Sequence, residues 1–99
     1  MVKRDRVEIM AEILSLCLEP QTKTHIMYGT NLSWKMLQHY LSELQTLKLL
    51  EIHNKSTKYV ATKRGREFLE KWKELQQLLY STKRPKNLQV QVLGGLFWA

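Results

Sequence analysis

Polar side chains on one predicted helix carry groups suited to recognising nucleic-acid bases. Lys35 and Gln38 lie three positions apart, so a helix places them on one face. Lys35 donates hydrogen bonds, and the Gln38 carboxamide both donates and accepts, which matches the atoms on base edges in the DNA major groove. Ser33 and the helix N-terminus suit a phosphate. The alternative is a solvated helix face. The complete predicted set on this helix is Ser33, Trp34, Lys35, Gln38, His39 and Ser42.

Two residues of this set have more than one interpretation. Trp34 could stack on a base or sugar, although a half-buried packing position at the head of the helix is favoured. His39 could contact a phosphate when it is protonated.

A second polar and basic segment follows. Its predicted phosphate-binding residues are Lys55, Ser56, Thr57 and Lys58 in a turn, and Lys63 and Arg64 at the start of the next helix. No acidic residue occurs in residues 52–66. Lysine and arginine on such a turn supply salt-dependent affinity for phosphates without sequence information. The alternative is a turn that is polar because it is solvated.

No residue pattern indicates catalysis. His25, His39 and His53 do not stand with a carboxylate or thiol at metal-ligand spacing. No glycine-rich phosphate loop, nucleophile elbow or paired-carboxylate motif is present. We therefore expect no enzymatic activity, no metal site, no cofactor and no small-molecule substrate. The single Cys17 cannot form an internal disulfide, and its simplest role is that of a small core residue in a reducing compartment.

The charge is concentrated in the middle of the chain. The 99 residues have a formal net charge of +7. Residues 21–66 carry eight lysines and arginines against two acids, whereas residues 1–20 carry three against four and residues 67–99 five against three. This distribution favours one positive face and a polyanionic partner, with a solvated basic surface as the alternative. No apolar run reaches the length of a membrane span, and no signal peptide is indicated, so we expect a cytoplasmic, nucleoid-associated protein.

The elements that must position these groups follow from hydrophobic spacing. An apolar stripe predicts a first helix over residues 5–18, which Pro20 ends. Thr22 is expected to cap a second helix over residues 23–28, with Gly29 as a left-handed exit. Ser33 is expected to cap a third helix that runs to about Leu47.

The rest of the chain predicts a hairpin and a fourth helix. Residues 49–53 and 58–61 suit two short strands around the polar turn 54–57. Thr62 is expected to cap the last helix, residues 63–80. The fold class is therefore mainly α with a small β-hairpin, in the order of a winged helix-turn-helix plus a long C-terminal helix. We divide the chain into residues 1–62 (winged helix-turn-helix), 63–80 (C-terminal dimerisation helix) and 81–99 (a tail that is strand-forming or disordered).

The last helix is the candidate dimer interface. Its apolar side is wider than a small core requires and would form an exposed patch without a partner. The alternative is that this side folds back on the first helix of its own chain. The predicted interface residues are Phe68, Leu69, Trp72, Leu75, Leu78 and Leu79.

The sequence also resembles a known family. Residues 22–41, TKTHIMYGTNLSWKMLQHYL, are similar to the TK-x-x-IMY-x-x-NLS signature of archaeal winged-helix proteins, which include predicted transcriptional regulators and the Sulfolobus 10a-type chromatin-associated proteins. Residues 62–69, TKRGREFL, are similar to the family's entry into its last helix. The resemblance spans about residues 5–80 and implies a winged-helix fold, duplex DNA as partner and dimers formed by antiparallel last helices. Carried over by position, it implies a recognition-helix surface of Ser33, Trp34, Lys35, Gln38 and His39, and a wing of Lys55, Ser56, Thr57 and Lys58.

Together these observations predict a homodimeric protein that binds double-stranded DNA, as a transcription regulator or an architectural chromatin-type protein. The main alternative is a winged-helix module for protein–protein interaction, because a fold does not fix a function. RNA binding is a weaker alternative, because no sheet of stacking aromatics is evident.

Overall fold

The first helix of the chain begins at a complete capping box. A computed structural model describes residues 5–80, and the predicted tail 81–99 lies outside the described residues. Helix α1 (Arg6–Leu16) starts after Asp5, whose carboxylate accepts from the Glu8 backbone N–H at 2.8 Å. The Glu8 side chain in turn accepts from the Asp5 N–H at 3.1 Å. The predicted first helix is confirmed, although it ends at Leu16, with Cys17 as its C-cap, and not at residue 18. Its apolar stripe is buried: Ile9, Met10, Ile13, Leu14 and Cys17.

Helix α2 (Lys23–Thr30) is two residues longer than the sequence predicts. Thr22 caps it as expected, with its hydroxyl accepting from the His25 N–H at 3.2 Å. The expected exit at Gly29 is wrong, because the helix continues and Asn31 takes the left-handed conformation at φ 59°. Thr30 fits the extension, since its buried hydroxyl donates to the Ile26 carbonyl at 2.8 Å and needs no partner outside the helix. Asparagine tolerates the left-handed conformation better than most non-glycine residues.

Helix α3 (Trp34–Thr46) agrees with its prediction. The Ser33 hydroxyl accepts from the Met36 N–H at 3.2 Å, and Leu47 is the C-cap residue. One side of the helix is buried in the core through Leu37, Tyr40, Leu41 and Leu44. Most side chains on the opposite side are exposed.

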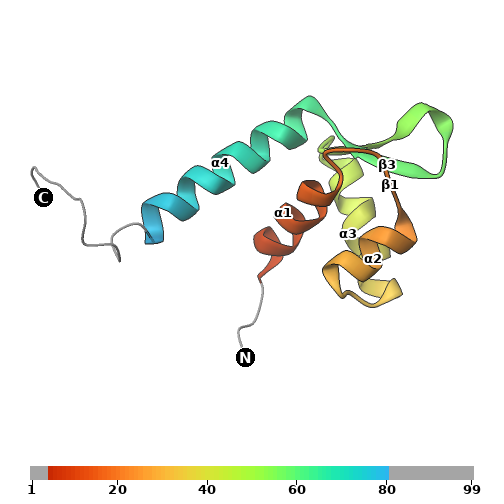
Figure 1. Ribbon diagram of the computed structural model, residues 1–99, viewed down its shortest axis with the longest axis horizontal. Helices are drawn as coiled ribbons and strands as arrows, with labels where there is room; N and C mark the ends of the chain where they lie inside the picture. The colour runs from red at the N-terminus through yellow and green to blue at the C-terminus, as the bar shows by residue number, and fades with distance from the viewer. Residues whose placement is uncertain (1–4, 81–99) are drawn as a thin grey trace, which may run out of the picture.

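The predicted hairpin forms part of a three-stranded antiparallel sheet. Strand β2 (Leu50–Ile52) pairs with β3 (Lys58–Ala61), and the loop contains a short helical turn, η1 (His53–Lys55). The sequence did not predict strand β1 (Gln21–Thr22), which pairs with the other edge of β3 in the order β1-β3-β2. Two residues are too short to show a periodicity, so β1 exists only through its pairing. Figure 1 shows the hairpin loop projecting from the body of the molecule on the side opposite α4.

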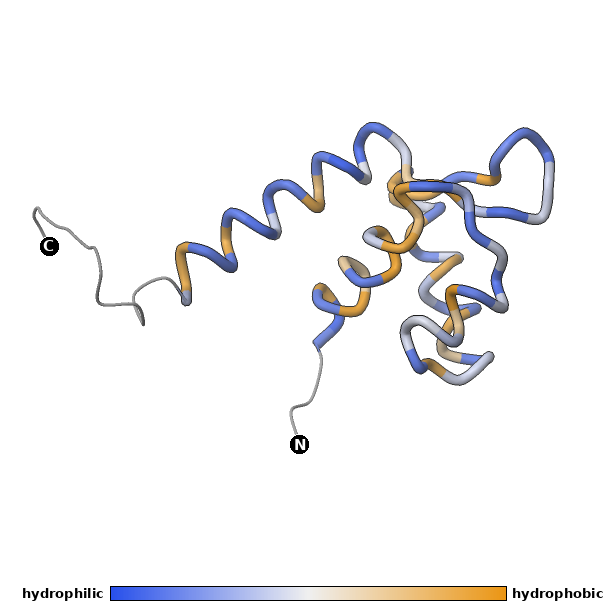
Figure 2. The backbone as a smooth tube through the Cα atoms, viewed as in Figure 1, coloured by the Kyte–Doolittle hydropathy of each residue, from blue (hydrophilic) through white to orange (hydrophobic). Residues whose placement is uncertain are grey.

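Helix α4 (Lys63–Tyr80) starts where the sheet ends. Thr62 caps it, with its hydroxyl accepting from the Gly65 N–H at 3.0 Å and donating to the Lys48 carbonyl at 2.7 Å. Leu69 belongs to the central core, and Phe68 and Trp72 pack partly buried against it. The C-terminal part of the helix leaves the body of the molecule (Figure 1), and hydrophobic and hydrophilic bands alternate along it (Figure 2).

The residues predicted for the dimer interface on α4 therefore fall into two groups, one packed in the core of the same chain and one exposed. Its N-terminal half contacts α1 of the same chain, as in the alternative interpretation. The later apolar residues remain open, with Leu75 50% exposed, Leu78 73% and Leu79 55%. Dimerisation stays a prediction, and the surface left for it consists of these three leucines.

Candidate nucleic-acid interface

The exposed side of α3 carries the predicted recognition residues. Trp34, Lys35, Gln38 and His39 are exposed, as is Ser42 one turn further along the helix. Ser33 precedes them as the N-cap residue, so its hydroxyl oxygen is used by the Met36 N–H while its hydrogen is free to donate outward. All six side chains thus lie on, or at the start of, the helix side that faces away from the core.

Lys23 of α2 joins this surface, although the sequence analysis did not include it. Its ammonium Nζ donates to Gln38 Oε1 at 3.3 Å. The same Nζ lies 5.2 Å from the centre of the Trp34 ring, within the range of a cation–π contact. Fifteen positions separate Lys23 from Gln38, so no local spacing in the sequence could have indicated the contact.

A groove of about 560 Å³ connects α2 to the hairpin. One wall is the start of α2, including Lys23, and the other carries Ser56 and Thr57 from the loop. Lys23 therefore lies at the junction of two surfaces, the exposed side of α3 and the hairpin loop. Through Lys23, the structure links Trp34 and Gln38 of α3 to the groove that Ser56 and Thr57 of the loop line.

The hairpin loop has a defined conformation that presents its basic residues outward. Asn54 and Lys55 adopt positive φ angles of 47° and 59°. The Ser56 hydroxyl donates to the His53 carbonyl at 2.6 Å and accepts from the Lys58 N–H at 3.1 Å, which closes the turn. The side chains of Lys55 and Lys58 are exposed on either side of this turn.

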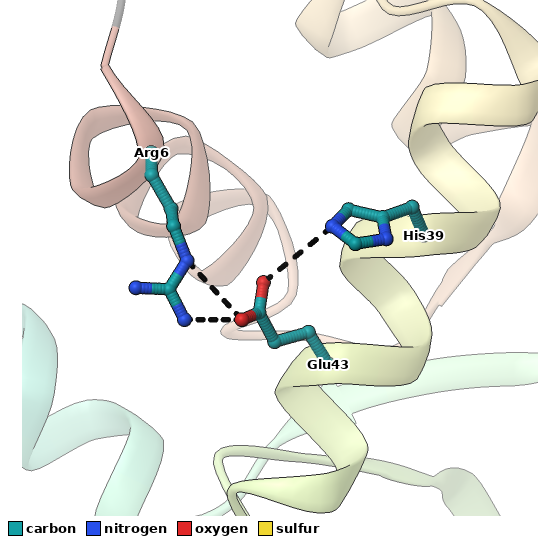
Figure 3. A network of polar contacts seen from close by, with 3 residues as sticks. All are labelled: Arg6, His39 and Glu43. Atoms are coloured by element: carbon teal, nitrogen blue, oxygen red, sulfur yellow. Dashed lines mark hydrogen bonds and ion pairs between the residues drawn. The ribbon is translucent and has the colours of Figure 1, made fainter.

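An ion pair joins α1 to the acidic residue of α3, Glu43. The Arg6 guanidinium of α1 binds the Glu43 carboxylate through two nitrogens, one of them Nε at 3.1 Å (Figure 3). His39 Nε2 lies 3.9 Å from the other carboxylate oxygen, Oε1. The hydrogen bond from Arg6 lowers the pKa of the Glu43 carboxyl, and the charge of His39, when present, acts in the same direction. Since the pKa is lowered in the folded chain, this contact stabilises above the carboxyl's ordinary range and is lost as the pH falls.

Lys63 and Arg64, at the start of α4, lie apart from the first turns of α3. Arg64 Nε donates to the Leu47 carbonyl at 3.1 Å, at the C-terminal end of α3. This position is about 20 Å along the helix from Ser33, since α3 rises about 1.5 Å per residue. Lys63 lines a separate groove with Leu18 and Glu67. The structure therefore does not group Lys63 and Arg64 with the first turns of α3.

Cys17 has a structural position. Its side chain is completely buried in the core, as the sequence analysis predicted. Burial raises the pKa of the Cys17 thiol to about 12. Among residues 5–80, no three histidine, cysteine or acidic side chains come together to hold a metal ion. Within the same range, no helix is both long and apolar enough to cross a membrane.

Three helices, a short antiparallel sheet with a basic hairpin loop, and an exposed face on the third helix define a winged helix-turn-helix domain. A family model described as "Winged helix-turn-helix" matches residues 3–80, and the chain belongs to this family. The predicted fold class is thereby confirmed.

Two similar proteins are archaeal, as the resemblance implied. An uncharacterized protein of Methanocaldococcus jannaschii is 36% identical over 83 residues, 83% of this chain. The chain spans 38% of the length of that relative. The crystal structure of Sso10a-2, a DNA-binding protein from Sulfolobus solfataricus, is similar with a TM-score of 0.66 and 26% identity over 89% of this chain and 100% of that chain. These matches confirm the resemblance to the archaeal winged-helix family.

Proposed function

We propose that this chain binds double-stranded DNA, with α3 in the major groove and the hairpin loop as a wing on the neighbouring phosphates. The observation that carries the proposal is the connected surface formed by α3, Lys23 and the loop. A helix with exposed hydrogen-bonding groups suits base edges, and a cationic loop beside it suits the backbone.

The charges around α3 support the same proposal. Residues 21–66 contain two acids, Glu43 and Glu51. Glu43 is the acid on α3, and Arg6 pairs with it. This pairing offsets the negative charge that would otherwise repel a phosphate backbone from the helix. The exposed groups of α3 nearest its N-terminus then present donors and a cation without a free carboxylate among them.

The domain family of the chain and its similarity to a DNA-binding protein both support the proposal. Winged helix-turn-helix domains place a helix in the major groove when they act on DNA. Sso10a-2, which resembles this chain over most of its length, is a DNA-binding protein. Whether this chain acts as a transcription regulator or as an architectural protein depends on its sequence specificity, which the second test below measures.

The first test compares nucleic acids. The affinity of the chain for a random duplex of about 30 base pairs and for single-stranded DNA of equal length is measured at two salt concentrations. Duplex binding that is stronger than single-strand binding and falls steeply with salt is expected. Absence of duplex binding at low salt would refute the proposal and favour a protein partner for the same surface.

The second test concerns the groove assignment. Lys35→Ala and Gln38→Ala are expected to change the preferred base sequence in a selection from random duplexes. Glu74→Gln, on the exposed part of α4, is the control and should leave the selected sequences unchanged. If neither α3 variant alters affinity for any duplex, α3 does not read the major groove.

We also propose that the chain acts as a homodimer through α4. The exposed Leu75, Leu78 and Leu79 would be covered in such a dimer. Two copies would then present two α3 helices to two half-sites, as dimeric proteins of this class do. Mass measurement across protein concentrations tests this, and a monomer at high concentration would refute it.

A further inference from the structure

Lys23 occupies a position that helix stability does not explain. It is the first residue of α2, directly after the Thr22 cap. A cation at a helix N-terminus is on the unfavourable side of the helix dipole. Its ammonium is nevertheless held by two residues of α3, the Gln38 carboxamide at 3.3 Å and the Trp34 ring at 5.2 Å. Both residues lie on one side of α3, because they are four positions apart.

The contact determines which way the Gln38 carboxamide points. An ammonium group only donates hydrogen bonds, so the carboxamide must turn its oxygen toward Lys23. The Nε2 amide group then lies on the other side of the same planar carboxamide. An exposed Gln38 held in this way presents two N–H donors to a partner. Lys23 occupies one of the two lone pairs of the carboxamide oxygen, and its positive charge beside that oxygen disfavours the approach of an amino donor from a base.

We propose that Lys23 is a positioning residue that makes Gln38 read its base pair as a donor, so that guanine is preferred there. This inference rests on the proposed DNA-binding function. In the major groove guanine offers two acceptors, N7 and O6, whereas adenine combines an acceptor with an amino donor and cytosine offers an amino donor. A glutamine free to use both ends of its carboxamide pairs with adenine instead. Lys23 therefore shifts the preference of Gln38 from adenine to guanine.

The experiment uses the full chain and four variants. Sequences are first selected from random duplexes, and the base pair read by Gln38 is identified as the position whose preference disappears in Gln38→Ala. Duplexes that carry each of the four base pairs at that position are then titrated with wild type, Lys23→Met, Gln38→Ala, the double variant and Lys73→Met. Lys73→Met removes the same charge from an exposed site on α4 and is the matched control.

Wild type is expected to bind the guanine duplex at least about fivefold more tightly than the adenine duplex. Lys23→Met is expected to lose that preference and to gain affinity for adenine relative to guanine, while Lys73→Met keeps the wild-type preference. The double variant should match Gln38→Ala alone, because Lys23 acts through Gln38. In the free protein, Lys23→Met should also shift the NMR signals of the Gln38 side-chain amide.

Several results would overturn the inference. One is a wild-type preference for any base other than guanine at the Gln38 position, and another is a selection in which no position depends on Gln38. A third is a Lys23→Met variant that weakens all four duplexes equally, which would make Lys23 a phosphate contact. Failure of the proposed function is distinct from these results, because wild type would then bind none of the duplexes at low salt.

Discussion

Removal of the two wing lysines should change the salt dependence of duplex binding by a calculable amount. Lys55 and Lys58 are exposed on the hairpin loop, and no acid lies in residues 52–66 to compete for them. Each phosphate contact contributes about 0.9 to the slope of log affinity against log salt, so Lys55→Ala with Lys58→Ala should flatten the slope by about 1.8. Between about 50 and 200 mM salt the variant should then lose about tenfold less affinity than wild type.

Fluorescence anisotropy with a labelled random duplex provides the measurement. The matched control is Lys71→Ala with Lys73→Ala, which removes two charges of the same type from exposed positions on α4. The control should leave the slope unchanged, because Lys71 and Lys73 are not part of the proposed DNA interface. Thermal melting of both variants shows that they remain folded.

Two results would refute the reasoning. Equal flattening of the slope in both double variants would mean that total charge, and not the wing, determines the salt dependence. An unchanged slope in the wing variant would mean that the hairpin loop does not contact phosphates. The second result would leave α3 as the candidate for DNA contact.

Three further predictions concern the core and the last helix. Gly65→Ala should destabilise the fold by about 3 kcal/mol in urea titrations, because the added Cβ would lie 2.2 Å from the Leu49 carbonyl oxygen. Gly29→Ala is the milder control, since its Cβ would meet the end of a flexible leucine side chain and alanine favours a helix. Cys17 should resist alkylation at pH 8 until the chain unfolds. Folding raises the pKa of the Cys17 thiol from 9.0 to about 12, so the unfolded chain loses the thiol proton at a lower pH than the folded chain. The contribution of Cys17 to the free energy of unfolding should therefore be fully present below pH 9.0 and should fall by about 1.4 kcal/mol per pH unit between pH 9.0 and about 12. Comparison of the alkaline unfolding curves of wild type and Cys17→Ala tests this, and parallel curves would contradict it. Leu78→Glu with Leu79→Glu should yield a monomer in sedimentation experiments at concentrations where wild type is dimeric, and an unchanged mass would exclude this surface as the dimer interface.

The sequence predicted the helices well because their signals are local. The apolar spacing of α1 and α3 and the caps Thr22, Ser33 and Thr62 involve residues within a few positions of one another. The exit of α2 was misplaced because a glycine suggested it, whereas the helix continues through Gly29 and Asn31 takes the left-handed conformation. Strand β1 could not be predicted, since two residues acquire a strand conformation only through pairing with β3.

The exposure of the candidate residues on α3 and the loop was predictable from the sequence, but their arrangement was not. The exposed side of α3 and the polar loop were identifiable from residue type and periodicity alone. The groove between α2 and the loop depends on how the sheet packs against the helices. The separation of Arg64 from the first turns of α3 depends in the same way on its bond to the Leu47 carbonyl.

The two contacts that local patterns could not indicate both act on α3 from other helices. Arg6 of α1 pairs with Glu43 and offsets its charge, and Lys23 of α2 holds the carboxamide oxygen of Gln38. The surface that α3 presents is therefore a property of three helices, even though its exposed residues belong to one. Transfer of the exposed α3 residues into another winged helix would carry over the side chains without the orientation of Gln38 or the offset charge of Glu43. Both properties should follow only when Arg6 and Lys23 are transferred as well.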